Sequence, residues 1–139
     1  MKSHFIKSLA SVGALTAVAV LAGCAAITPA TPEATVQKRA QERVNLMQAR
    51  EFTKAYAYLT PSYRALNDAD SYSKSFGSGA SWVEPKVDQV KCPDSDRCLV
   101  SVTVGVQVVA PGFGTKPLPS TMWETWVLEN GQWWFHKYN

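Results

Sequence analysis

The order of apolar and polar residues predicts helices in the first part of the chain beyond residue 33. From Ala34 to Glu51, apolar residues recur every three or four positions, which is typical of an amphipathic helix. Residues 52–59 continue the helical pattern. Thr60-Pro61 matches an N-cap followed by proline at the first helical position, and we expect that helix to end near Asn67. The apolar stripe of the first helix consists of Val36, Ala40, Val44 and Met47, with Leu46 on its flank.

A last helical turn is predicted before the pattern changes. Asp68 or Asp70 could cap a turn that runs through Phe76, because a short acidic side chain can accept hydrogen bonds from the first free N–H groups of a helix. The glycine-rich segment Gly77-Ser78-Gly79 then ends the helical part of the chain.

The remainder of the chain alternates apolar and polar residues, as half-buried strands do. Residues 82–92 and 98–109 are the first two predicted strands, and every second residue of the latter from Val100 to Val108 is valine. Gly105 interrupts its polar face and indicates a bend or bulge. Residues 110–119 are rich in proline and glycine, so we expect a long connecting loop there.

Two further strands, Met122 to Glu129 and Gln132 to Tyr138, are joined by Asn130-Gly131, the strongest short signal for a two-residue hairpin turn. A turn of this length fixes the register. We expect both faces to be covered over part of the hairpin, because each carries large aromatic side chains. One face receives the pairs Leu128–Trp133, Trp126–Phe135 and Glu124–Lys137, and the other receives Val127–Trp134, Thr125–His136 and Trp123–Tyr138.

The beginning of the chain has the layout of a secretory leader. Lys2 and Lys7 precede an uncharged apolar run, residues 10–22, that is too short to span a bilayer comfortably as a helix. The run ends in Leu21-Ala22-Gly23-Cys24, which resembles the lipobox of bacterial lipoproteins. The resemblance implies cleavage between Gly23 and Cys24 and lipid on the Cys24 thiol. An ordinary signal peptide cut nearby, or an uncleaved anchor, is the alternative.

The lipobox resemblance divides the chain of 139 residues into three parts. Residues 1–23 are the signal peptide, residues 24–33 are the lipidated cysteine with a proline-containing tether, and residues 34–139 form one domain. Position 25 is alanine and not aspartate, which in Gram-negative lipoproteins resembles the outer-membrane pattern. We therefore expect an anchored envelope protein that faces the periplasm if the source is Gram-negative.

The charge balance gives no reason to expect a nucleic-acid partner. Lys2 and Lys7 account for two of the 14 basic residues, which leaves 12 basic residues against 11 acidic ones. The basic residues of the first predicted helix alternate with Glu42 and Glu51 and do not form a basic patch. We expect them to lie on a solvated helix face: Lys38, Arg39, Arg43 and Arg50.

Assigning Cys24 to lipid leaves Cys92 and Cys98, which bracket a turn-rich pentapeptide between two predicted strands. A disulfide across the neck of that hairpin is favoured, and an oxidising compartment permits it. The alternatives are free thiols or a metal site. Structural zinc takes four ligands, and His136 is the only histidine beyond the leader, so we expect neither a metal nor another cofactor.

Helices followed by an antiparallel sheet predict an α+β fold. Three segments carry a resemblance to the NTF2-like superfamily: helical residues 51–64, the valine strand, and Glu129-Asn130-Gly131-Gln132-Trp133-Trp134-Phe135. The resemblance implies a curved antiparallel sheet packed on the N-terminal helices as a cone, with a cavity at its open end. It also implies that a homodimer through the sheet is possible.

The superfamily contains isomerases and dehydratases as well as non-catalytic domains, so the fold does not decide the function. An isomerase-like site would need acids and phenols inside the cone, and the available side chains have ordinary structural roles as core aromatics, helix caps or strand residues. No catalytic residue is therefore assigned. The side chains considered are Tyr56, Tyr58, Tyr63, Asp68, Asp70 and His136.

Five tryptophans, which most simply pack the core and sheet, could also line a pocket or an interface. The leading hypothesis is a membrane-anchored, non-catalytic module that docks to another envelope protein. The alternative is a module that binds a small apolar ligand in the cone, and an isomerase-like or dehydratase-like enzyme ranks third. The candidate pocket or interface residues are Tyr56, Tyr63, Trp82, Trp123, Trp126, Trp134 and His136.

Overall fold

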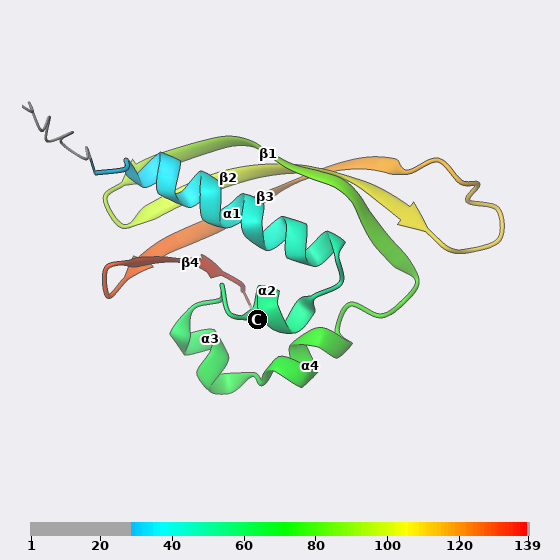
Figure 1. Cartoon of the computed structure of the whole chain (residues 1–139), viewed down its shortest axis with the longest axis horizontal. Helices are drawn as coiled ribbons and strands as arrows, with labels where there is room; N and C mark the ends of the chain where they lie inside the picture. The colour runs from blue at the N-terminus through cyan, green and yellow to red at the C-terminus, as the bar shows by residue number, and fades with distance from the viewer. Residues whose placement is uncertain (1–28, 139) are drawn as a thin grey trace, which may run out of the picture.

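The structure, a computed structural model, describes residues 29–138 (Figure 1). The predicted leader, the lipobox and Cys24 lie outside this range. The described residues form an α+β fold, as predicted, in which a four-stranded antiparallel sheet of order β1-β2-β3-β4 follows the helices and is not closed. None of these helices is long and apolar enough to cross a membrane. The elements are α1 (Pro32–Gln48), α2 (Phe52–Tyr56), α3 (Pro61–Leu66), α4 (Ala69–Lys74), β1 (Ala80–Asp94), β2 (Arg97–Val108), β3 (Leu118–Glu129) and β4 (Gln132–His136).

Helix α1 begins inside the segment that the sequence assigned to the tether. The Thr31 hydroxyl oxygen accepts a hydrogen bond from the Ala34 N–H at 3.2 Å, and Pro32 occupies the first turn. This is the same Thr-Pro start signal that we recognised at Thr60-Pro61. The Thr60 hydroxyl oxygen likewise accepts from the Tyr63 N–H, at 3.3 Å, at the start of α3.

Helix α1 ends three residues earlier than predicted. Arg50 adopts a left-handed conformation with φ 59°. Its N–H donates to the Met47 carbonyl at 3.1 Å, and the Glu51 N–H donates to the Leu46 carbonyl at 2.9 Å. These are the paired hydrogen bonds of a Schellman ending, in which a residue with positive φ stops the helix. The ending was not predicted because glycine usually provides this conformation and the sequence has arginine.

The core lies between α1 and the face of the sheet that α1 covers (Figure 1). The predicted stripe is confirmed, because Val36, Ala40 and Val44 are fully buried and Met47 is nearly so. The valines at positions 100, 102 and 104 face the helix from β2 and are also fully buried. A second cluster forms beneath α1, where Ala55, Leu59 and Tyr72 bring α2 and α4 together.

The segment between α2 and α3 is attached to the backbone of β4. The Phe135 N–H donates to the Tyr58 carbonyl at 2.8 Å, and the Thr60 N–H donates to the Phe135 carbonyl at 3.2 Å. Leu59 and Phe135 form a parallel bridge between these segments. These bonds hold the segment between α2 and α3 against β4, at one side of the region beneath α1.

The irregularity expected at Gly105 lies on the neighbouring strand. Strand β2 pairs with β3 in regular register, whereas the register of β1 shifts between Val83 and Lys86, and Glu84 has φ 48°. A Cβ atom on Gly105 would lie 3.0 Å from the Pro117 Cβ and 3.2 Å from the Val83 carbonyl oxygen. Glycine is needed there because β1 and the loop before β3 approach the backbone closely.

The β3–β4 hairpin has the predicted turn and register. Asn130 and Gly131 have φ values of 53° and 76°, and five pairs from Glu129–Gln132 to Thr125–His136 form the ladder. Strand β4 ends at His136, so the expected pairs Glu124–Lys137 and Trp123–Tyr138 are not part of it. On the other face, Thr125, Val127, Trp134 and His136 are partly buried, as expected, but this cover does not extend to Trp123, which is 57% exposed.

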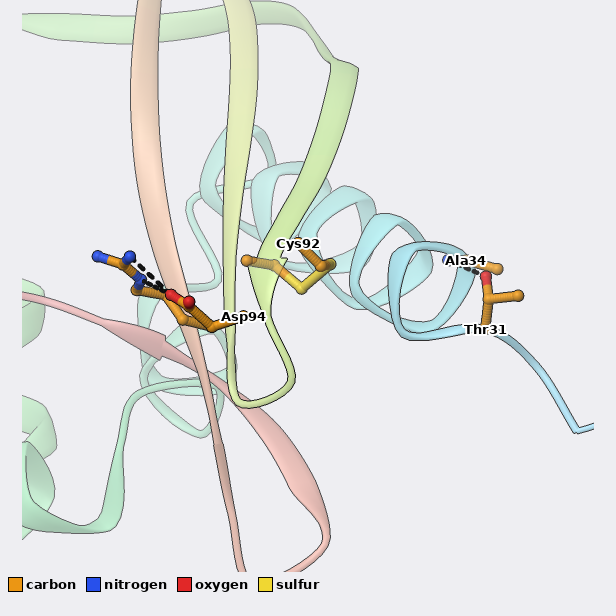
Figure 2. Close-up of a disulfide and its surroundings, with 6 residues drawn as sticks. Thr31, Ala34, Cys92 and Asp94 are labelled. Carbon is orange, nitrogen blue, oxygen red and sulfur yellow. Dashed lines mark hydrogen bonds and ion pairs between the residues drawn. A yellow bond between two sulfur atoms is a disulfide. The ribbon is translucent and has the colours of Figure 1, made fainter.

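Cys92 and Cys98 form a disulfide across the β1–β2 hairpin, as predicted (Figure 2). Their Cα atoms lie 4.0 Å apart, and Cys98 is fully buried against the core. In the turn between them, Arg97 forms an ion pair with Asp94 at 2.6 Å. Figures 1 and 2 both place the start of α1 beside this hairpin.

Candidate functional site

A cavity of about 200 Å³ lies beneath α1, between α4 and the helix-covered face of the sheet. Its wall is mostly apolar and aromatic, with three charged side chains and one phenol. This composition is typical of small-molecule sites, which are mainly apolar and carry a few polar groups that fix orientation. The lining residues are Arg43, Met47, Tyr72, Phe76, Trp82, Met122, Trp123, Glu124, Phe135 and Lys137.

A buried ion pair forms the polar part of the cavity wall. Arg43 Nη1 on α1 lies 2.5 Å from Glu124 Oε1 on β3, and the two side chains are only 5% and 4% exposed. The other carboxylate oxygen of Glu124 accepts a hydrogen bond from the Trp126 indole N–H at 3.1 Å. Both oxygens of Glu124 are therefore engaged by groups of the protein.

The guanidinium of Arg43 is held by an aromatic ring as well as by its ion pair with Glu124. Its central carbon lies 3.8 Å from the centroid of the Phe135 ring, a distance at which a cation interacts favourably with an aromatic face. Its Nε is buried and has no hydrogen-bond partner among residues 29–138. The site thus contains a buried cation with unused donor capacity.

Tyr72 supplies a phenol at the same wall. Its hydroxyl donates to the sulfur of Met47 at 3.6 Å, and thioether sulfur is a weak acceptor. Burial raises the pKa of Tyr72 above the ordinary value of 10.0, although the nearby positive charge of Arg43 acts in the opposite direction. The hydroxyl is therefore protonated at neutral pH and serves as a donor.

Several residues predicted to form a pocket do lie at or near the cavity. Trp82 and Trp123 line it, and Trp126 stands behind Glu124. The Tyr63 ring packs edge-on against Tyr72 with centroids 6.4 Å apart, and burial raises the pKa of the Tyr63 hydroxyl. The remaining tyrosine of the predicted set, Tyr56, has a structural role because its hydroxyl donates to the carbonyls of Arg64 and Asn67.

Other predicted residues lie outside the cavity lining. The guanidinium carbons of Arg39 and Arg64 both lie over the Trp134 ring, 5.6 Å and 5.0 Å from its centroid. The His136 ring packs edge-on against Tyr138 with centroids 4.7 Å apart. Tyr58 donates to Glu42 at 3.1 Å, and desolvation, reinforced by this carboxylate, raises the pKa of its hydroxyl.

The two aspartates considered for acid–base chemistry do not line the cavity. Asp68 caps α4, where the Ser71 N–H donates to its carboxylate at 2.7 Å and lowers its pKa. Asp70 forms an exposed ion pair with Lys74 at 2.6 Å. Within residues 29–138, no three His, Cys, Asp or Glu side chains are placed to hold a metal ion. The cavity therefore combines a mostly apolar lining with one buried ion pair.

The prediction that Arg43 lies on a solvated face is wrong, and neither Glu124 nor Tyr72 was singled out as a site residue. The sequence did contain a signal for the burial of Arg43 and Glu124. Arg43 lies three residues after Ala40 and four before Met47, so it falls on the apolar stripe of the helix. Glu124 alternates with Met122 and Trp126 on the helix-covered face of β3. A charged residue at a buried position of each pattern indicates a buried pair.

Comparison with known proteins supports the fold and no more. The chain matches no protein-family model, and no curated protein resembles it in sequence. Its fold is similar to that of a SEC-C motif containing protein from Rhodopseudomonas palustris, with a TM-score of 0.56 and 15% identity. The match covers 71% of this chain and 73% of the other.

Proposed function

We propose that this protein is a bacterial envelope lipoprotein, anchored through lipid on Cys24, whose domain is a non-catalytic module that docks to another envelope protein. The leader and lipobox support the anchor. Residues 25–31 separate Cys24 from the start of α1, and an extended segment of this length spans about 22 Å at about 3.1 Å per residue. The domain then stays close to the membrane surface, and its partner has to be reachable from there.

We further propose that the domain belongs to the NTF2-like type. In support, the helices precede the sheet, the four strands follow one another in a meander, and a cavity lies between α1 and the covered sheet face. The register shifts of β1 also support this proposal, since bulges increase the twist of a strand and bend it, as the curved sheet of a cone would require.

The observation that carries the docking proposal is an apolar hairpin end, which we define as Val109, Phe113 and Leu118. These side chains are 74%, 55% and 53% exposed, and they lie at the β2–β3 connection. Figure 1 places this connection at the end of the molecule opposite the start of α1. With α1 held near the membrane by a short tether, the apolar hairpin end projects away from the lipid, toward a protein partner with an apolar groove.

Photo-crosslinking in the native host tests the docking proposal. A photoreactive phenylalanine analogue at Phe113 is expected to trap a specific envelope protein. The matched control is the same analogue at Asp96, which is also exposed but lies in the β1–β2 turn at the opposite end. Absence of a product specific to position 113 would count against docking, and a product made of two copies of this chain would replace the partner with a homodimer.

The anchor is tested separately by mass spectrometry and fractionation. The intact protein from its host is expected to lack residues 1–23 and to carry diacylglycerol on Cys24. Cys24→Ser removes the thiol that would be acylated, so the variant is expected to leave the lipidated fraction. An original protein without lipid on Cys24, or a Cys24→Ser variant that still carries the lipid mass, would refute the lipobox interpretation.

A second candidate function, binding of a small ligand, is favoured by the cavity beneath α1. Its volume and its apolar lining suit a compact molecule, and its charged groups are confined to one wall. An isomerase-like or dehydratase-like activity is not proposed, since Asp68 and Asp70 lie away from the cavity and Glu124 has both oxygens engaged.

A further inference from the structure

We propose that the cavity beneath α1 binds a small monocarboxylate with a one-ring apolar body, and that Arg43 anchors the carboxylate. The inference deepens the second candidate function and is independent of the docking proposal. It depends on the volume of the cavity, on its charge balance, and on the unused donors of Arg43.

The volume sets the size of the ligand. An apolar cavity of about 150 Å³ in an engineered protein binds benzene. The cavity here measures about 200 Å³, which leaves room for one ring and a short acidic substituent. Phe76, Trp82 and Phe135 contribute aromatic side chains to the lining, and the two methionines, Met47 and Met122, can adapt to an irregular body.

The charge balance selects an anion over an amine. Among the lining residues, Arg43 and Lys137 are cations and Glu124 is the one carboxylate. The two carboxylate oxygens of Glu124 already contact Arg43 and the Trp126 indole N–H, so Glu124 is poorly placed to bind a ligand cation. The net charge of the lining is positive, and a ligand carboxylate would balance it.

Arg43 has the donors that a carboxylate needs. A guanidinium carries five N–H groups, and within residues 29–138 the Arg43 side chain uses Nη1 toward Glu124 while its buried Nε has no partner. The guanidinium carbon lies 3.8 Å from the centroid of the Phe135 ring, and this contact together with the ion pair to Glu124 restricts the movement of the guanidinium. The Tyr72 hydroxyl donates to the Met47 thioether, a weak acceptor, and lies near the Arg43 guanidinium, so it is a further donor that a carboxylate bound to Arg43 could accept from.

Methionine methyl NMR gives a direct readout, because the two methionines beyond Met1 both line the cavity. The full chain from its host, labelled at the methionine methyl carbons and extracted in mild detergent, is titrated with phenylacetate. Phenylacetamide serves as the neutral control of the same shape, and phenethylamine serves as the cationic one. Phenylacetate is expected to shift both signals saturably and to bind at least about tenfold more tightly than either control, as one charge-assisted hydrogen bond implies.

Two variants test the anchor. Arg43→Lys keeps the charge beside Glu124 but loses the planar fork, and it is expected to weaken phenylacetate binding about tenfold. The double variant Arg43→Met/Glu124→Gln removes both charges and is expected to bind phenylacetate no better than phenylacetamide. Arg97→Lys, an exposed arginine in the β1–β2 turn, is the matched control and should bind as the original protein does. Signal dispersion in each spectrum reports whether the variant is folded.

The inference is overturned if neither methionine signal moves with phenylacetate. It is also overturned if phenylacetamide binds as tightly as phenylacetate, or if the folded double variant binds phenylacetate as the original does. None of these three results affects the crosslinking at Phe113, so failure of the ligand proposal is distinguishable from failure of the docking proposal.

Discussion

Replacing Arg43 with methionine tests whether the interior of this domain depends on its buried ion pair. The variant leaves the Glu124 carboxylate 4% exposed, with the Trp126 indole N–H as its hydrogen-bond donor among the described residues. Removing one partner of a buried pair typically costs about 3–5 kcal/mol, because the remaining charge is uncompensated. We expect about 4 kcal/mol, a large fraction of the roughly 5–15 kcal/mol that stabilises a domain.

The reverse single variant, Glu124→Gln, is expected to cost less, about 3 kcal/mol, at the low end for breaking a buried pair. The glutamine carbonyl can still accept from the Trp126 N–H, and the Arg43 cation keeps its contact with the Phe135 ring at 3.8 Å. The double variant Arg43→Met/Glu124→Gln leaves no buried charge in the pair. Its cost is expected to be about 1–2 kcal/mol, well below the sum of the two single variants.

The assay is urea unfolding of the chain with its disulfide intact, followed by tryptophan fluorescence and by circular dichroism. The free energy of unfolding is extrapolated to water, and the slope with urea is checked for change. Arg97→Met is the matched control, because it breaks an exposed pair with Asp94 and should change stability by no more than about 1 kcal/mol. If Arg43→Met behaved like this control, or if the single losses simply added in the double variant, the pair would not be buried as described.

Three further predictions use the same unfolding measurement. Replacing Cys92 and Cys98 by serine opens a loop with a sequence separation of 6 and should cost about 2 kcal/mol; no loss would mean that the disulfide constrains little. Gly105→Ala places a Cβ 3.0 Å from that of Pro117 and should cost about 1–2 kcal/mol, whereas unchanged stability would indicate that the loop moves aside. Burial raises the pKa of Tyr72, so its contribution is fully present below the unfolded pKa of about 10 and is lost as the pH rises toward the folded pKa. Tyr72→Phe should therefore flatten the alkaline decline in stability, and an identical slope would argue against burial of this hydroxyl.

Those parts of the fold that depend on local signals could be predicted from the sequence. The Thr60-Pro61 start of α3, the Asp68 cap, the Asn130-Gly131 turn and the disulfide each involve residues close together in the chain. The early start of α1 carried the same kind of signal at Thr31-Pro32 and was assigned to the tether because prolines there suggested an extended segment.

The parts that depend on distant residues were not predicted. The Schellman ending at Arg50 is supported by hydrogen bonds from its side chain to the carbonyls of Gly77 and Ala80, which α1 alone does not reveal. The pair formed by Arg43 and Glu124 joins positions 81 residues apart. Each of those charges has an ordinary exposed role when its own element is considered alone, and only the packing of α1 on β3 makes the pair necessary.

Each of the two edge strands of the sheet, β1 and β4, is hydrogen-bonded to a segment outside the sheet. At β4, the Phe135 backbone is bonded to Tyr58 and Thr60. At β1, the Gln41 side chain of α1 donates to the Pro85 carbonyl at 2.9 Å and accepts from the Val87 N–H at 2.8 Å. An open edge is a template on which another chain can add a strand, and copies anchored on one membrane, as proposed above, would meet often. These hydrogen bonds occupy backbone groups on both edge strands that a second chain would otherwise pair with, so they would hinder the proposed anchored protein from joining its neighbours into extended sheets.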